Sequence, residues 1–259
     1  AKQIGVGAIL GAPFMLSTIA FFLVGITVTA TSLMKKRRFE IIVETESMKR
    51  DLSFFMIMYG IAIIMPLFIK NANIFIAVLL VAGYVFYAYR TFKGESSDIM
   101  HSDELYFKRI ILKIFAKRAE EGETASLPLI TLQILAALSI MISGTHVFVG
   151  SIEKISLAWG MNPLLFALLV APIATELPEK FNSVTWTIKG RDSLAMGNIT
   201  GAMVFQSTFP VSLGLIFTDW QISGLALFSA ALALISAAIA LTALIFRKKL
   251  YPLIILFGG

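Results

Sequence analysis

The sequence contains no cysteine and only two histidines among its 259 residues. The absence of cysteine excludes disulfides and thiolate metal sites. Charged residues are also scarce, at 15% of the chain, whereas they make up about a quarter of a typical soluble domain. Hydrophobic residues make up 58%. This composition excludes an ordinary soluble domain and predicts a polytopic membrane protein.

Long apolar runs are present instead, and most approach the roughly 20 residues that a helix needs to cross a bilayer. We expect seven spans and a truncated eighth, at 4–34, 52–69, 73–89, 128–149, 160–187, 195–217, 221–245 and from 250 onward. Pro172 and Pro178 interrupt the fifth run, and Pro210 interrupts the sixth. Broken helices are tolerated at membrane depth only where the freed backbone is buried in protein or lines a cavity. We therefore expect these two runs to lie inside the protein.

The net charge of +6 comes from an uneven distribution of Lys and Arg along the chain. All but four of the 22 basic residues fall in alternate connections, at 35–51, 90–127, 188–194 and 246–249. An excess of Lys and Arg marks the cytoplasmic side. The expected partners are therefore the lipid bilayer, in the plasma (inner) membrane, and no nucleic acid. Within 90–127 the sequence also favours an amphipathic helix, either on the inner leaflet or as a solvated linker.

Two segments of the chain repeat one another. Residues 7–18 read GAILGAPFMLST and residues 197–208 read GNITGAMVFQST, with six of the twelve positions identical. Small-residue packing motifs alone could produce such a match, but the Ser-Thr pair matches as well as the glycines. The segments belong to the first and sixth spans, which cross in opposite senses. Inverted repeats of interrupted helices place a binding site near the midplane, so the sequence predicts a secondary transporter.

The fifth run contains charged residues inside apolar sequence. A charge at the centre of a spanning helix costs roughly 2.5–3.5 kcal/mol, so such residues are functional candidates by default. Residues three and four apart face one another on a helix. One stripe then holds Thr175, Glu179 and Asn182, and the next holds Glu176, Lys180 and Ser183.

Two interpretations of these charges are open. Glu176 and Lys180 can form an ion pair that neutralises both. Glu179 then has no cationic partner nearby in sequence, and a bound cation would supply one. Carboxylate, hydroxyl and carbonyl oxygens suit Ca²⁺, Mg²⁺ or an alkali ion, and Pro172 and Pro178 free upstream carbonyls that could complete the site.

The sixth run adds further polar groups. Asn198, Gln206 and Ser207 would be presented by the re-entering helix. Gly197 and Gly201 would permit close approach of a neighbouring backbone.

At these residues the chain resembles the sodium/calcium exchanger superfamily of cation antiporters. APIATELPEK looks like the region of the family's G-T-S-L-P-E signature, and DSLAMGNITGAMVFQST looks like its G-N-x-x-G-S stretch. The resemblance implies an all-α inverted-repeat bundle of about ten spans in full. Residues 1–89 would be the remainder of the first half, 90–127 a cytoplasmic loop and 128–259 the second half. The start of the first repeat is expected to precede Ala1.

The resemblance further implies a transporter rather than an enzyme, with no cofactor. Its ligands would be transported metal cations: Ca²⁺ or another divalent ion, exchanged for Na⁺ or H⁺. Glu179 matches the family's principal acidic ligand, Thr175 its hydroxyl partner and Pro172 a position that lends a carbonyl. The full set of expected ligands is Glu179, Thr175, Glu176, Pro172, Gln206 and Ser207.

Departures from the family pattern keep other functions open. Ala12 and Ala202 replace a serine, and four residues further on Leu16 and Gln206 replace an Asn or Asp. A transport-inactive relative that serves as a regulatory or scaffolding subunit would fit these losses. A membrane-embedded metal hydrolase would need imidazole or carboxylate partners, and both histidines are distant in sequence from the glutamates. The sequence predicts no oligomeric state.

Overall fold

The computed structural model describes residues 2–69, 72–94, 127–222, 224–247 and 249–258. Within these ranges the chain is almost entirely helical, and its β-structure is limited to one isolated bridge between Ile41 and Leu250. Six helical stretches are long and apolar enough to cross a membrane. The chain is therefore an all-α, multi-pass membrane protein, as the composition predicts.

Helices occur in each of the predicted runs, but the fifth run, 160–187, is divided into two short helices and is not among the six stretches that could cross a membrane. In the first half they are α1 (Lys2–Met15), the π-helical turn η1 (Leu16–Ala20), α2 (Phe21–Leu33), α3 (Thr45–Phe68) and α4 (Asn73–Gly94). In the second half they are α6 (Leu127–Ala158), α7 (Pro163–Thr175), α8 (Leu177–Ile188), α9 (Asp192–Gln206), α10 (Phe209–Phe217), α11 (Gly224–Arg247) and α12 (Pro252–Gly258). The amphipathic helix predicted within 90–127 lies outside the described residues.

Prolines set the interruptions of the fifth and sixth runs. Pro163 is the first residue of α7. Pro178 lies in the first turn of α8, directly after a break at Glu176, and Pro210 lies in the first turn of α10. A proline has no N–H to donate to the carbonyl four residues earlier, so it starts a helix more readily than it continues one. The predicted breaks at Pro178 and Pro210 are therefore confirmed, whereas Pro172 is accommodated inside α7.

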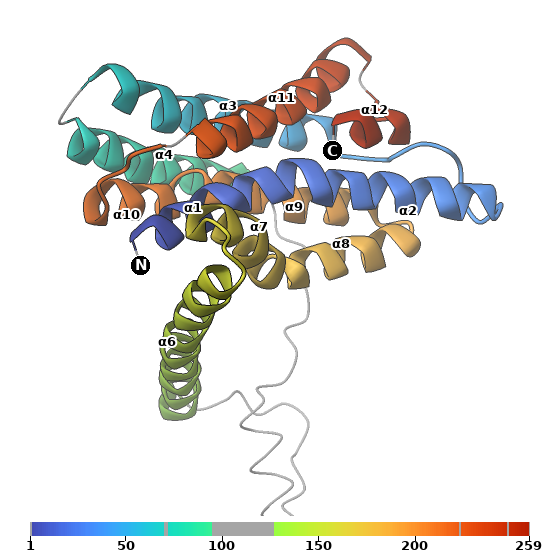
Figure 1. Cartoon of the computed structure of the whole chain (residues 1–259). Helices are drawn as coiled ribbons and strands as arrows, with labels where there is room; N and C mark the ends of the chain where they lie inside the picture. The colour runs from blue at the N-terminus through green and yellow to red at the C-terminus, as the bar shows by residue number, and fades with distance from the viewer. Residues whose placement is uncertain (1, 70–71, 95–126, 223, 248, 259) are drawn as a thin grey trace, which may run out of the picture.

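The two halves pack in a reciprocal pattern. α12 packs against α2 as α10 packs against α4, and α11 packs along α1 as α3 packs along α9. One hydrophobic core extends through these helices, and its largest fully buried side chains include Tyr59, Phe21 and Phe55. Figure 1 shows α6 projecting away from this bundle, and none of its most apolar stretch is buried.

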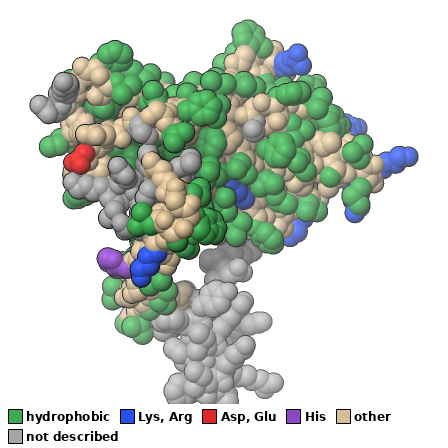
Figure 2. All heavy atoms as spheres, in the orientation of Figure 1, with side chains coloured by type: hydrophobic (Ala, Val, Ile, Leu, Met, Phe, Trp, Pro, Cys, Tyr) green, Lys and Arg blue, Asp and Glu red, His purple; other side chains and the backbone are tan. Residues whose placement is uncertain are grey.

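The molecular surface suits a lipid environment. Many large hydrophobic side chains are exposed, and they cover most of the face seen in Figure 2. Most of the Lys and Arg side chains visible there lie toward one side of the bundle. In Figure 1 this is the side on which α2 ends and the chain turns from α8 to α9. The arrangement agrees with the predicted cytoplasmic side.

Candidate ion site at two helix breaks

The break between α7 and α8 directs one charged stripe into the protein. Glu176 is 3% exposed and Lys180 is 6% exposed. Glu179 is half-buried, whereas Thr175 and Asn182 on the same stripe are exposed. The two stripes predicted from helical spacing therefore differ in burial, and the stripe of Glu176 and Lys180 is the more deeply buried.

Three polar atoms at this break have no hydrogen-bond partner among the described residues: Glu176 Oε2, Glu179 Oε2 and Lys180 Nζ. All three are buried. The ion pair between Glu176 and Lys180 that the sequence allows is not formed, because Lys180 Nζ contacts no carboxylate of the described chain. Burying charged groups without partners is costly. The break is therefore the part of the described chain where a charged ligand has most to gain.

Helix α9 supplies the polar neighbours of this break. Gln206 Nε2 donates a hydrogen bond of 2.9 Å to Glu176 Oε1. Asn198 Nδ2 donates to the backbone carbonyl of Glu179 and to Ser183 Oγ, both at 3.2 Å. Gln206 is the last residue of α9, so the interrupted ends of the fifth and sixth runs meet here.

The other expected ligands make hydrogen bonds within their own helices. Ser207 Oγ donates to a carbonyl one turn earlier at 3.0 Å, and Thr175 Oγ1 does the same at 3.1 Å. The carbonyl of Pro172 accepts the N–H of Glu176 at 2.9 Å. The structure thus joins Glu176 directly to Gln206, whereas Thr175, Pro172 and Ser207 have internal partners.

The expectation for Gly197 and Gly201 is wrong within the described residues. A Cβ added to either glycine would meet no heavy atom within 4 Å, so neither makes a close helix contact. Both instead line a cavity of about 480 Å³ between α3, α4 and α9. The polar contact of α9 with α8 is made by the side chain of Asn198, and the two glycines open onto the cavity instead.

This cavity also contains a buried carboxylate that the sequence reasoning missed. Asp51 on α3 is 4% exposed and lines the cavity. Its Oδ1 accepts a bond of 2.6 Å from the Tyr87 hydroxyl on α4, and its Oδ2 accepts one of 2.7 Å from Thr200 on α9. Asp51 was expected in a polar connection before residue 52, but α3 begins about two turns earlier, at Thr45. The apolar spacing of Met48 and Leu52 was the available signal.

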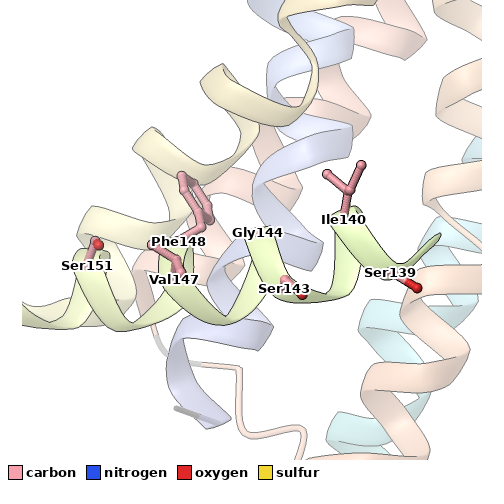
Figure 3. A pocket seen from close by; sticks show the side chains of 7 residues that line it. All are labelled: Ser139, Ile140, Ser143, Gly144, Val147, Phe148 and Ser151. Atoms are coloured by element: carbon pink, nitrogen blue, oxygen red, sulfur yellow. The ribbon is translucent and has the colours of Figure 1, made fainter. Parts of the chain in front are cut away.

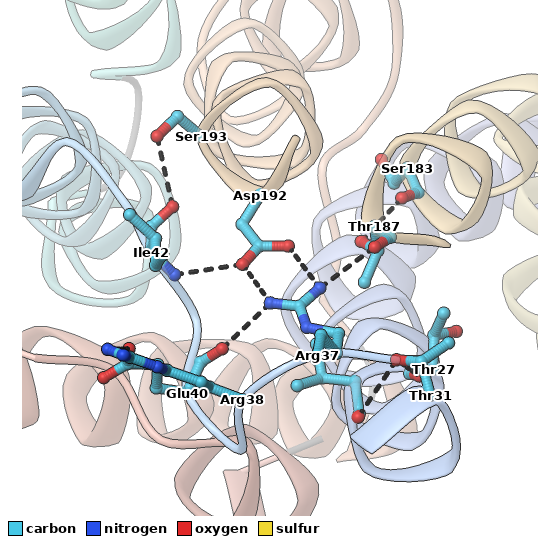
Figure 4. A network of polar contacts seen from close by, with 11 residues as sticks. Thr27, Thr31, Arg37, Arg38, Glu40, Ile42, Ser183, Thr187, Asp192 and Ser193 are labelled. Atoms are coloured by element: carbon cyan, nitrogen blue, oxygen red, sulfur yellow. Dashed lines mark hydrogen bonds and ion pairs between the residues drawn. The ribbon is translucent and has the colours of Figure 1, made fainter. Parts of the chain in front are cut away.

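A second polar network fixes the connection after α2 to the turn between α8 and α9 (Figure 4). Arg37 Nη1 donates to Asp192 Oδ1 at 2.8 Å, and Arg37 Nη2 donates to Asp192 Oδ2. The same guanidinium reaches the carbonyls of Thr187 and Glu40, both at 2.9 Å. Asp192 is buried and also accepts the N–H of Ile42 at 3.0 Å. The ion pair joins residues 155 positions apart, so no local pattern could have predicted it.

A groove of about 710 Å³ runs along α6, and the residues of the described chain that line it all belong to that helix (Figure 3). Its lining residues are Ser139, Ile140, Ser143, Gly144, Val147, Phe148 and Ser151. None of them carries a charge, so this groove has no group that could neutralise a cation. The charged break between α7 and α8 remains the candidate ion site.

Comparison with known proteins finds similarity to one family of transporters. Residues 129–256 match the sequence model of the family described as "Sodium/calcium exchanger protein". The fold matches the crystal structure of the H⁺/Ca²⁺ exchanger CAX with a TM-score of 0.73 and 18% identity, over 99% of this chain and 63% of that one. The second half of this chain is similar to the sodium/calcium exchanger family, and its fold is that of a cation/calcium exchanger.

A second solved structure and two curated proteins also match this chain. A structure of the sodium-calcium exchanger NCX_Mj soaked with 100 mM Na⁺ and 10 mM Sr²⁺ has a TM-score of 0.60 and 16% identity, over 100% of this chain and 75% of that one. CaxA of Alkalimonas amylolytica is 30% identical over 96 residues, which are 37% of this chain and 30% of CaxA. The inner membrane protein YrbG of Escherichia coli K12 is 30% identical over 108 residues, which are 42% of this chain and 33% of YrbG.

The chain therefore spans about a third of the length of the curated relatives that it matches. The family and its structural neighbours are transporters and not enzymes. These matches favour transport over the membrane-embedded metal hydrolase that the two glutamates kept open.

Proposed function

We propose that this exchanger-family chain is part of a secondary active antiporter that exchanges Na⁺ or H⁺ for Ca²⁺ or another divalent cation. The observation that carries the proposal is the pair of buried glutamate oxygens without partners at the α7–α8 break. Carboxylate oxygens are the preferred ligands of Ca²⁺ and other hard cations. A bound cation would pair with Glu179 and Glu176 and remove the cost of burying them alone.

Glu179 is the proposed central ligand because the resemblance to the family's signature falls on this residue and its Oε2 is unpartnered. Glu176 would be the second carboxylate, held in position by the amide of Gln206. Thr175, Pro172 and Ser207 complete the proposed set with hydroxyl and carbonyl oxygens. An oxygen that already takes part in a bond to its own helix can still accept through its remaining lone pair.

The proposed coupling is competition for the same carboxylates. A divalent ion and the coupling ions both need Glu179 in its ionised form, so they bind in turn and not together. Alternating access would follow if one bundle of helices moved against the site, as in other inverted-repeat transporters. The plasma (inner) membrane is the proposed location.

The proposed domain organisation is two inverted halves, 1–89 and 128–259, joined by a cytoplasmic loop at 90–127. The reciprocal packing of α12 on α2 and α10 on α4 supports it. So does the presence of an irregular turn in both repeated segments, at η1 and after Gln206.

The test is isotope flux by the full-length protein in proteoliposomes. We expect radioactive Ca²⁺ uptake to follow an outward Na⁺ gradient or an outward H⁺ gradient, and the two gradients are imposed separately to identify the coupling ion. Glu179→Gln should lower uptake by about 100-fold, because removing one partner from a buried charge interaction costs about 3 kcal/mol or more.

Glu46→Gln is the matched control, since this glutamate has a side chain that is 85% exposed and lies at the start of α3. It should transport as the wild type does. Uptake by Glu179→Gln at the wild-type rate would remove the proposal.

A transport-inactive regulatory subunit is the second candidate. It is favoured by the position of Leu16, which is fully buried in the hydrophobic core and offers no ligand where the family has Asn or Asp. Calorimetric titration with Na⁺, Ca²⁺, Mg²⁺ and Mn²⁺ separates the candidates. An inactive relative should give no saturable heat with any of the four ions.

A further inference from the structure

Lys180 is a buried cation whose surroundings contain more negative charge than it can neutralise. Its side chain is enclosed, and Nζ has no hydrogen-bond partner among the described residues. The backbone N–H of Lys180 donates to the carbonyl of Glu176 at 3.2 Å. This helical bond places the two side chains on the same face of the chain, one turn apart.

The break between α7 and α8 contains charged side chains of both signs. Its carboxylates, Glu176 and Glu179, each have one buried oxygen without a partner. Lys180 adds one positive charge beside them, so the three side chains together carry a net charge of −1. An ammonium near two incompletely satisfied carboxylates attracts both, yet no direct contact is formed.

We propose that Lys180 is a tethered cation that permanently neutralises one of the two carboxylate charges. It therefore reduces by one the number of monovalent ions that bind in each transport cycle. This inference rests on the proposed function and specifies its ion stoichiometry. Glu179 and Glu176 bind the mobile ions, and Lys180 sets how many of them are needed. The attraction acts inside a low-dielectric region, where it is much stronger than in water.

The experiment measures the dependence of uptake on the coupling ion for Lys180→Gln in the full-length protein in proteoliposomes. We expect the Hill coefficient for the coupling ion to rise by about one. The Ca²⁺ concentration for half-maximal uptake should fall by about tenfold, because a repelling charge has been removed from the site. The membrane potential at which net Ca²⁺ flux stops should shift by the amount expected for one more monovalent ion per cycle.

Three further variants distinguish this role from a structural one. Lys180→Arg keeps the charge and should keep the wild-type Hill coefficient. Lys189→Gln makes the same change at an exposed position just after α8 and should behave as the wild type. The double variant Glu176→Gln/Lys180→Gln restores the net charge of −1, so its Hill coefficient should return to the wild-type value even if its maximal rate is low.

A wild-type Hill coefficient and stopping potential in a folded Lys180→Gln protein would overturn the inference and leave the antiporter proposal intact. If Lys180→Gln does not fold, the charge-balanced double variant decides: a Hill coefficient different from the wild type overturns the inference. Absence of exchange by the wild-type protein would overturn the proposed function, and this inference with it.

Discussion

The two copies of the repeated segment, 7–18 and 197–208, share half their residues and differ in what surrounds them. In the first copy a Cβ on Gly11 would lie 2.3 Å from the carbonyl oxygen of Leu168 and 2.5 Å from Pro172 Cγ. Helix α1 therefore rests directly on α7. In the second copy the equivalent Gly201 opens onto the cavity between α3, α4 and α9.

The first copy, which packs closely, is also the less polar of the two. Leu16 in the first copy is buried in the hydrophobic core, whereas its counterpart Gln206 bonds to Glu176. Leu10 is also in the core, whereas its counterpart Thr200 bonds to Asp51. The shared residues thus determine where the helix is interrupted, and the residues between them decide whether the segment packs or presents polar groups.

The largest expected effect comes from breaking the ion pair that joins the end of the first span to the helix of the second copy. Arg37→Ala removes the guanidinium that joins the connection after α2 to Asp192 at the start of α9. It leaves a buried carboxylate without its cation, so we expect a loss of about 3–5 kcal/mol of stability. Thermal or chemical unfolding in detergent measures it. Arg38→Ala is the control, because that side chain is 90% exposed; equal stability of the two variants would contradict the prediction.

The next effect tests the glycines directly. Gly11→Ala places a methyl group against the backbone of α7, and we expect it to lower stability by about 1–3 kcal/mol through overpacking. Gly201→Ala makes the same change where the cavity leaves room, and should be neutral or stabilising by up to about 1 kcal/mol, since alanine is the better helix former. If Gly201→Ala lowered stability more than Gly11→Ala in the same unfolding assay, Gly201 and not Gly11 would be the glycine at a close helix contact.

A third change makes the second copy resemble the first. Thr200→Val removes the hydroxyl that donates to the buried carboxylate of Asp51, and should cost about 1–3 kcal/mol. Thr145→Val is the control on the exposed helix α6, where the hydroxyl bonds only to its own helix. Denaturant titration of the two variants side by side gives the comparison. A Thr200→Val protein as stable as the control would mean that Asp51 does not depend on this donor.

The smallest expected effect concerns the turn η1 in the first copy. Ser236 on α11 donates its hydroxyl to the carbonyl of Ser17 within η1. Ser236→Ala should cost about 0.5–1.5 kcal/mol, the usual contribution of one hydrogen bond. Ser229→Ala removes a hydroxyl from the same helix that bonds only within it, and should cost less. If Ser229→Ala lowered stability more than Ser236→Ala in the same unfolding assay, the bond from Ser236 to η1 would not be the stabilising one.

Local sequence information predicted the features that depend on one helix at a time. The spans, the breaks near Pro178 and Pro210 and the stripe of Glu176 and Lys180 follow from run length, proline chemistry and helical spacing. The structure contains the two breaks, the stripe and the predicted spans, except that the fifth run is divided into two short helices. Residue roles in ion binding remain predictions.

Contacts between helices that are far apart in the sequence could not be predicted from local patterns. The pair of Arg37 with Asp192 and the bonds of Asp51 to Tyr87 and Thr200 connect helices far apart in sequence. The role expected for Gly201 failed for the same reason. A glycine pattern shows that a close approach is sterically possible, but the neighbouring helices decide whether one occurs.

The π-helical turn η1 has a consequence for how α2 is oriented. Such a turn holds one residue more than an α-helical turn of similar length. If all five residues of 16–20 adopted regular α-helical geometry, everything after them would be rotated by about 100°. Phe21, Val24 and Val28, now in the core, would swing toward the lipid. This one extra residue therefore sets the angular phase of the whole second half of the first span.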